Sequence, residues 1–182
     1  MIPVGYMAKN VAARPDWLKA SLVNDIYSVS SCISDNFTDY INYWKHNGYW
    51  LFDTPITIWD IAKQNSLDIS NAMLFFYEVY ELEFDADKNS WIPFDPESSF
   101  VTEVTKPGEK TLEGYDVVTF SGHTSPECSP LSCNALATEL ETNEHCLLPS
   151  LEKAKEFLDA GKFKNSEPGP YRIFAVYTVQ WS

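Results

Sequence analysis

The chain has 182 residues, of which 45% are hydrophobic and 15% aromatic, and its formal net charge at pH 7 is −13. This length suits one domain over residues 1–182 with a substantial core, and the aromatic content argues against a disordered chain. The negative charge disfavours phosphate backbones and anionic lipids, so we expect no nucleic-acid partner and no membrane partner.

The first forty residues predict two strands and then a helix. Residues 2–11 and 25–31 are expected to be extended. A helix begins near Phe37, where apolar residues recur at i, i+3, i+4 and i+7. Either Ser34 or Asn36 can cap this helix, because both side chains can accept a hydrogen bond from its first turn.

The middle of the chain predicts a second helix and one long strand. Residues 49–52 are a short apolar strand, and Thr54-Pro55 supplies a cap followed by proline in the first helical turn. Residues 72–84 are the longest strand candidate, apolar on both faces at first and acidic toward the end. Residues 90–114 are rich in proline and are expected to be mostly loop.

The last third predicts helices and a central strand. Residues 115–120 are extended, and Ser129-Pro130 begins a helix that places Cys133 on its apolar face. Ser150 caps a further helix, and residues 171–181 are apolar on both faces at first, which is typical of a central strand. Since the order lacks a regular βαβ repeat, we expect an α+β fold: a mixed or mainly antiparallel sheet with short helices packed mostly on one face.

Acidic residues are concentrated between residues 73 and 116, which carry eleven acidic and three basic side chains, a net charge of −8. A field of this sign attracts a basic protein. Our leading functional hypothesis is therefore a non-enzymatic acidic domain that binds a basic protein partner. The carboxylates expected at that contact are Glu81, Glu83, Asp85, Asp87 and Glu97.

These carboxylates are also compatible with acid–base chemistry or with simple solubility. Glu81 and Glu83 would share one strand face, and such pairs can separate their pKa values for acid–base chemistry. A solvated acidic surface that keeps the protein dissolved is the simpler interpretation.

Cysteines in the last third predict two alternative chemistries. Cys128 lies before a helix start, so it could be the nucleophile of a small cysteine-dependent enzyme or a redox-responsive protein, with His123 or His145 as base. Alternatively, Cys128, Cys133, His145 and Cys146 could hold zinc, although their spacing is not that of a common zinc motif. A purely structural interpretation makes Cys133 and Cys146 small buried hydrophobes.

Several common functional signals are missing from the sequence. There is no P-loop, no G-x-G-x-x-G, no G-x-S-x-G and no H-E-x-x-H motif, so we expect no cofactor. The N-terminal residues 1–5 lack a basic start followed by an apolar run, so we expect a cytoplasmic protein with free thiols.

Three short blocks carry a resemblance: ECSPLSCN at residues 127–134, NEHCL at 143–147 and EPGPY at 167–171. They resemble a C-terminal pattern of small uncharacterised bacterial proteins, over roughly residues 115–181, which implies a shared family and no particular activity. In size, acidity and aromatic content the chain also resembles bacterial immunity proteins. That second resemblance implies an immunity or antitoxin function against a basic toxin.

Overall fold

The computed structural model describes residues 1–41, 46–93, 103–120 and 126–181. Its strands are β1 (Ile2–Asn10), β2 (Ala12–Ala13), β3 (Asp25–Ile26), β4 (Asp35–Asn36), β5 (Met73–Asp85), β6 (Ser90–Pro93), β7 (Thr111–Thr119) and β8 (Tyr171–Val179). Its helices are α1 (Pro55–Gln64), α2 (Pro130–Cys133) and α3 (Leu151–Asp159), with 3-10 turns η1 (Phe37–Tyr40) and η3 (Leu136–Thr138). Within these ranges, no helix has the length and apolar character needed to span a bilayer.

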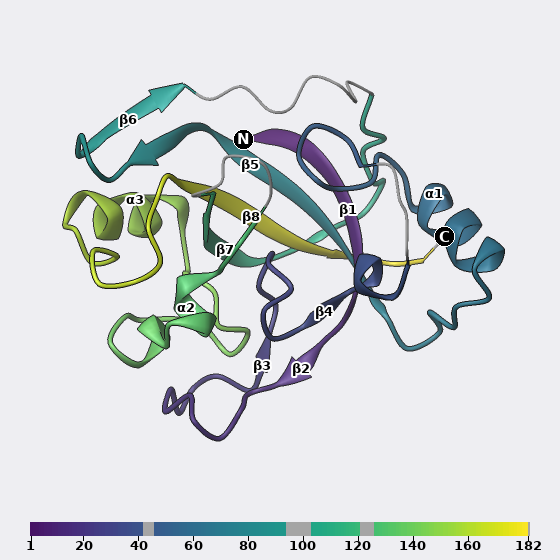
Figure 1. Cartoon of the computed structure of the whole chain (residues 1–182), viewed down its shortest axis with the longest axis horizontal. Coiled ribbons are helices and arrows are strands. Elements are labelled where there is room, and N and C mark those ends of the chain that lie inside the picture. The colour runs from purple at the N-terminus through teal and green to yellow at the C-terminus, as the bar shows by residue number, and fades with distance from the viewer. Residues whose placement is uncertain (42–45, 94–102, 121–125, 182) are drawn as a thin grey trace.

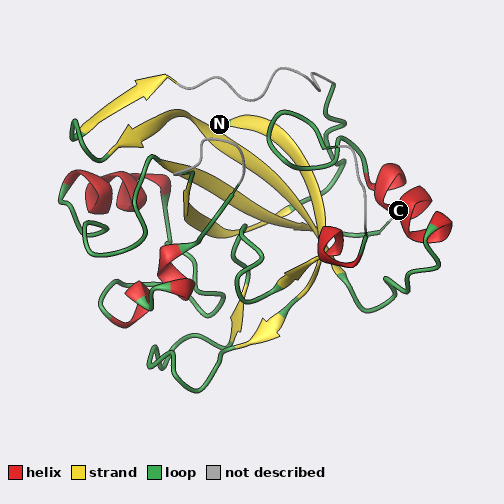
Figure 2. Ribbon diagram, in the orientation of Figure 1, coloured by secondary structure: helices red, strands yellow, loops and turns green. Residues whose placement is uncertain are grey.

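One curved antiparallel sheet organises the molecule (Figure 2). Its strands follow the order β4-β1-β5-β8-β7, and β6 pairs with the far end of β5. β8 is therefore central, between β5 and β7, as its two apolar faces predict. The expected α+β fold with a mainly antiparallel sheet is confirmed.

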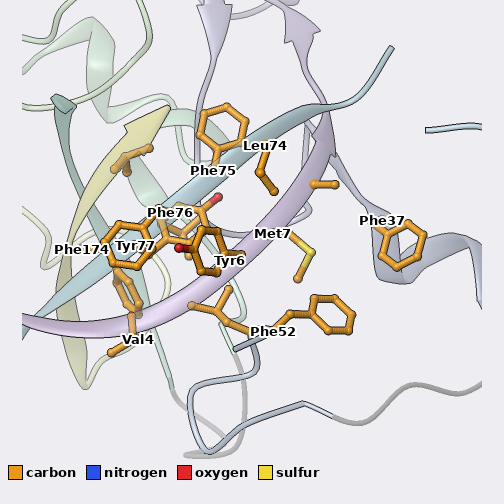
Figure 3. Packing of buried hydrophobic residues seen from close by; sticks show 14 of the residues in the cluster. Val4, Tyr6, Met7, Phe37, Phe52, Leu74, Phe75, Phe76, Tyr77 and Phe174 are labelled. Atoms are coloured by element: carbon orange, nitrogen blue, oxygen red, sulfur yellow. The ribbon is translucent and has the colours of Figure 1, made fainter. Parts of the chain in front are cut away.

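Two core clusters pack against the sheet, and on β8 alternate side chains, which point to opposite faces, belong to different clusters. On β8, Phe174 and Val176 belong to the first cluster, whereas Tyr171 and Ile173 belong to the second. The first cluster includes residues of α1, and the second includes residues of η3 and α3. Figure 3 shows the aromatic centre of the first cluster, where the ring centroids of Tyr6 and Phe76 lie 5.0 Å apart. Burial of such large rings supplies much of the hydrophobic stabilisation.

The capping residues of two predicted helices occupy the positions expected. Thr54 Oγ1 accepts a hydrogen bond from the Thr57 amide at 3.2 Å, with proline at the first helical position of α1. Ser150 Oγ accepts from the Lys153 amide at 3.1 Å at the start of α3. These local signals fix both helix starts.

Three predicted elements between residues 25 and 52 are shorter than expected. The strand expected over residues 25–31 is limited to β3, because the amides beyond it bond to side chains and loop carbonyls instead of a strand. The helix expected at Phe37 is the 3-10 turn η1, and the extended backbone of Ile41 ends it. Of residues 49–52, Phe52 alone forms a strand-like bridge, with Tyr6 of β1.

The helix expected after Ser129 is broken. α2 ends at Cys133, Ala135 adopts a left-handed conformation (φ 58°), and η3 follows. Leu136 and Ala137 stay buried in the second core cluster, but Cys133 is only half-buried and is separated from their apolar stripe. The prediction that Cys133 belongs to a continuous apolar helix face is therefore wrong.

A close approach in β1 gives a test of this fold. Gly5 has φ +132° at an irregularity of the β1–β5 ladder, and a Cβ there would lie 2.5 Å from Phe52 O and 2.9 Å from Leu51 Cβ. Gly5→Ala should lower the free energy of unfolding by about 2 kcal/mol or more in urea titrations. Gly108→Ala is the matched control, since nothing lies within 4 Å of its added Cβ, and it should change stability by less than about 1 kcal/mol. Equal effects of the two variants would contradict the packing of Phe52 against β1.

Candidate functional site

Three cysteines from two distant segments converge in space. Cys32 lies in the loop between β3 and β4, Cys128 precedes α2, and Cys133 ends α2. Their Sγ atoms all lie within 4.8 Å of one another. Figure 1 shows α2 beside the loop that joins β3 to β4. Exposure is graded, because Cys32 is exposed, Cys133 is half-buried and Cys128 is buried.

A buried carboxylate on β7 joins the two segments. Asp116 Oδ2 accepts hydrogen bonds from the Val29 amide at 2.8 Å and from the Ser129 hydroxyl at 2.6 Å. Ser129 Oγ in turn accepts from the Ser30 amide at 3.3 Å. Val29 and Ser30 lead into Cys32, and Ser129 follows Cys128, so this arrangement sets the two cysteine segments side by side. We call it the Asp116 clamp.

A buried lysine holds the loop from its other side. Lys9 of β1 has no exposed surface, and its ammonium donates to Ser30 O at 2.9 Å, Val29 O at 3.3 Å and Asn36 Oδ1 at 2.5 Å. These three acceptors satisfy the three N–H donors of the ammonium group. The loop that carries Cys32 is therefore fixed by one buried anion and one buried cation.

Polar groups also surround the sulfur atoms. The Cys32 thiol donates to Glu127 O at 3.2 Å, and the Cys128 thiol donates to Asn134 Oδ1 at 3.6 Å. The hydroxyls of Ser30 and Ser132 each lie 3.9 Å from Cys133 Sγ. The segment before α2 is fixed to β7, because Thr119 N donates to Cys128 O at 2.8 Å and Glu127 N donates to Thr119 O at 3.0 Å.

The three thiols differ in acidity. Hydrogen bonds from Cys128 and Cys133, followed by that from Ser30 and by the positive charge of Lys9, outweigh burial and lower the pKa of Cys32. Interactions with Cys133 and Cys32, followed by burial, raise the pKa of Cys128. The hydrogen bond from Cys128 lowers the pKa of Cys133. The hydrogen bond to Cys32 and burial outweigh this effect, so the pKa of Cys133 is raised overall.

The sequence identified two members of this cluster and missed the third. Cys128 and Cys133 were candidates, but the thiol whose pKa falls is Cys32 rather than Cys128. A helix dipole gives Cys128 no support, since α2 has four residues. Cys32 could not be found by spacing, because it lies far from the other two along the chain and no motif contains it.

The other predicted thiol-site residues lie elsewhere. Cys146 is 2% exposed in the second core cluster, as expected for a small buried hydrophobe. His145 Nδ1 lies 2.6 Å from Asp25 Oδ1, and its ring stacks on Tyr27 with centroids 4.0 Å apart. In the described ranges, one group of at least three Cys, His, Asp or Glu residues brings its ligand atoms within 4.8 Å of one another. It consists of Cys32, Cys128 and Cys133. His123 lies outside the described residues.

The described members of the five predicted partner-binding carboxylates differ in exposure and in their partners. Glu83 is 7% exposed, and its Oε2 accepts from Arg172 Nε at 3.0 Å. The β5–β8 register shifts between Val79 and Glu83, and Glu81 is exposed where Glu83 is buried, so they do not share an environment. Of the other three carboxylates, Asp85 pairs with Lys88 at 2.7 Å and Asp87 is exposed. Glu97 lies outside the described residues.

No protein-family model matches the chain, and neither the curated proteins nor the solved structures contain a match. The function of the chain is therefore inferred from the chemistry of the site itself.

The buried lysine gives a pH-dependent test of the site. Burial lowers the pKa of Lys9 to about 7, partly opposed by negative charge nearby. The titratable groups that act on it are Asp116 on β7, Asp39 in η1, Cys32 in the loop and Asp35 on β4. Because its folded pKa lies below the ordinary value of 10.5, the folded state binds fewer protons than the unfolded state between pH 7 and about 10. The contribution of Lys9 to stability therefore rises with pH across that window.

Lys9→Met removes this titration. Urea unfolding at several pH values gives the free energy of unfolding of both proteins. The wild-type value minus the Lys9→Met value should increase from pH 7 to about 10. Lys19→Met, at an exposed lysine, controls for the loss of one positive charge. A difference that stays flat across this window would contradict the burial of a titrating Lys9.

Proposed function

We propose that the protein is a redox-responsive thiol protein in which Cys32 meets the oxidant and Cys133 completes a disulfide. The observation that carries this proposal is the convergence of three Sγ atoms within 4.8 Å together with their graded exposure. An exposed thiol beside less exposed ones is the arrangement of redox-sensing cysteines, where an accessible thiol is oxidised and a neighbour resolves it.

The reaction needs a hydroperoxide, and hydrogen peroxide is the simplest. The Cys32 thiolate attacks one peroxide oxygen, the O–O bond breaks, and the departing hydroxide takes up a proton to become water. Cys32 is then a sulfenic acid. The Cys133 thiol loses its proton and attacks that sulfur, the S–O bond breaks, and the departing hydroxide takes up this proton to leave as a second water. Two thiols have thus lost two electrons and two protons, and one peroxide has become two waters.

Two features favour Cys133 over Cys128 as the resolving thiol. Cys128 is 7% exposed, its backbone is paired with β7, and its thiol donates to Asn134 Oδ1. Cys133 is half-buried at the end of α2, nearer to solvent. A disulfide requires the two sulfurs to approach to about 2.05 Å. The two Sγ atoms already lie within 4.8 Å of each other, so we expect rotation of the Cys32 and Cys133 side chains to close that distance.

Binding of a basic protein, the function expected from charge, stays a prediction. The exposed carboxylates Glu81 and Asp87 support it, but Glu83 and Asp85 are each neutralised by an internal ion pair. The immunity-type function that depended on this surface has therefore less support than the thiol chemistry.

Peroxide treatment of the chelator-treated, reduced full-length protein tests the proposal. After blocking of free thiols and proteolysis, mass spectrometry should find a Cys32–Cys133 cross-link, with Cys128 and Cys146 still alkylated. Cys32→Ser should slow thiol loss by at least about tenfold, because the exposed thiol is gone. Cys128→Ser should keep the cross-link.

Cys146→Ala is the matched control, since Cys146 is a free cysteine of the second core cluster, outside the group of three, and it should leave the oxidation rate unchanged. Oxidation of Cys32→Ser at the wild-type rate would overturn the assignment of Cys32. A dominant Cys32–Cys128 cross-link would overturn the assignment of Cys133.

A further inference from the structure

We infer that the reduced cluster of Cys32, Cys128 and Cys133 is a binding site for one Zn²⁺ ion, with a fourth coordination position on the side of Cys32. The inference goes beyond the proposed redox function: it uses the thiol of Cys128 as well as those of Cys32 and Cys133, and it needs no oxidant and no disulfide.

The sulfur geometry fits a zinc ion closely. A Zn–S bond of about 2.3 Å places the sulfurs of a tetrahedral site about 3.8 Å apart. The three Sγ atoms already lie within 4.8 Å of one another. Inward shifts of less than about 1 Å therefore suffice, and side-chain rotation can supply them without a change in the backbone.

Three sulfurs are more than a disulfide requires. A two-electron oxidation uses two cysteines, yet the fold brings three together from two segments. The Asp116 clamp holds both segments in place before any ion arrives. Such preorganisation lowers the cost of binding, since the ligands need little ordering. A third sulfur within the same 4.8 Å is what a metal site uses and a simple disulfide does not.

The coordination would be of the open type. Zinc sites that keep three protein ligands leave the fourth position to water or to a small ligand, whereas closed structural sites have four. In the described ranges, the converging group has three members and no fourth Cys, His, Asp or Glu. Cys32 is the exposed member, so solvent or a small anionic ligand would reach the ion from its side.

The surroundings suit a thiolate-bound cation. The hydroxyls of Ser30 and Ser132, each 3.9 Å from Cys133 Sγ, can turn their protons toward a thiolate. Three thiolates and one Zn²⁺ carry a net charge of −1, and the buried ammonium of Lys9, bonded to Ser30 O, supplies a positive charge behind the loop. Thiolates select zinc over Mg²⁺ and Ca²⁺, which require oxygen ligands.

Zinc titration of the reduced, metal-free full-length protein under anaerobic conditions tests the site. Competition with a chromophoric chelator should give one Zn²⁺ per chain. Cys32→Ser, Cys128→Ser and Cys133→Ser should each weaken binding by at least about 100-fold, since loss of an outer-shell partner alone costs about 10–100-fold. Cys146→Ala should bind like the wild type, because this thiol lies outside the cluster. Failure of the reduced wild type to bind one Zn²⁺, or equal loss in Cys146→Ala, would overturn the inference.

A second measurement avoids dependence on variants that could fail to fold, as Cys128 is buried. In the wild type, Zn²⁺ should slow alkylation of Cys32, Cys128 and Cys133 together, as read by mass spectrometry, and Mg²⁺ should not. Zinc that leaves alkylation of these three cysteines unchanged would overturn the site.

The two proposals fail separately. The peroxide experiment contains chelator and no metal, whereas the zinc titration contains no oxidant. Zinc binding without a Cys32–Cys133 cross-link would sink the redox function and leave the zinc site standing. A cross-link without zinc binding would do the reverse.

Discussion

The arrangement of the site depends on one buried carboxylate. Asp116 Oδ2 receives the Val29 amide at 2.8 Å and the Ser129 hydroxyl at 2.6 Å, and these bonds tie together two segments that the sequence places far apart. Hydrogen bonds to a charged group contribute about 1.5–3 kcal/mol each. Burial raises the pKa of Asp116 to about 6, and the hydrogen bonds from Ser129 and Val29 oppose this rise. No other side chain described on β7 accepts hydrogen bonds from both the Val29 amide and the Ser129 hydroxyl.

The sheet explains why this carboxylate can be where it is. β7 pairs with the central strand β8, and Asp116 lies opposite Phe174 in that ladder. The ladder therefore holds the backbone of Asp116 independently of the hydrogen bonds of its side chain. Lys9 on β1 approaches the same loop from the other half of the sheet. A rigid sheet thus positions an anion and a cation against an irregular loop, and the loop presents Cys32. Functional groups on loops held by a rigid scaffold are a common arrangement.

Local signals in the sequence predicted the long strands and two helix starts of the scaffold. The apolar faces of β5 and β8, the caps Thr54 and Ser150 and the central place of β8 all follow from neighbouring residues. The site depends on contacts that no local pattern contains. Cys32 joins Cys128 only through the fold, and Cys133 leaves its expected apolar stripe because of a left-handed Ala135, where no glycine marks the break.

The most direct measurement of the central claim is the binding of arsenite, which condenses with three neighbouring thiols to give three As–S bonds and three waters. The reduced wild type should lose three titratable thiols per arsenite bound and keep Cys146 free, and Asp116→Asn should bind arsenite at least about tenfold more weakly, in line with the loss of a charged hydrogen bond. A wild-type protein in which arsenite masks fewer than three thiols, or an Asp116→Asn variant that binds it equally well, would contradict a cluster held together by Asp116.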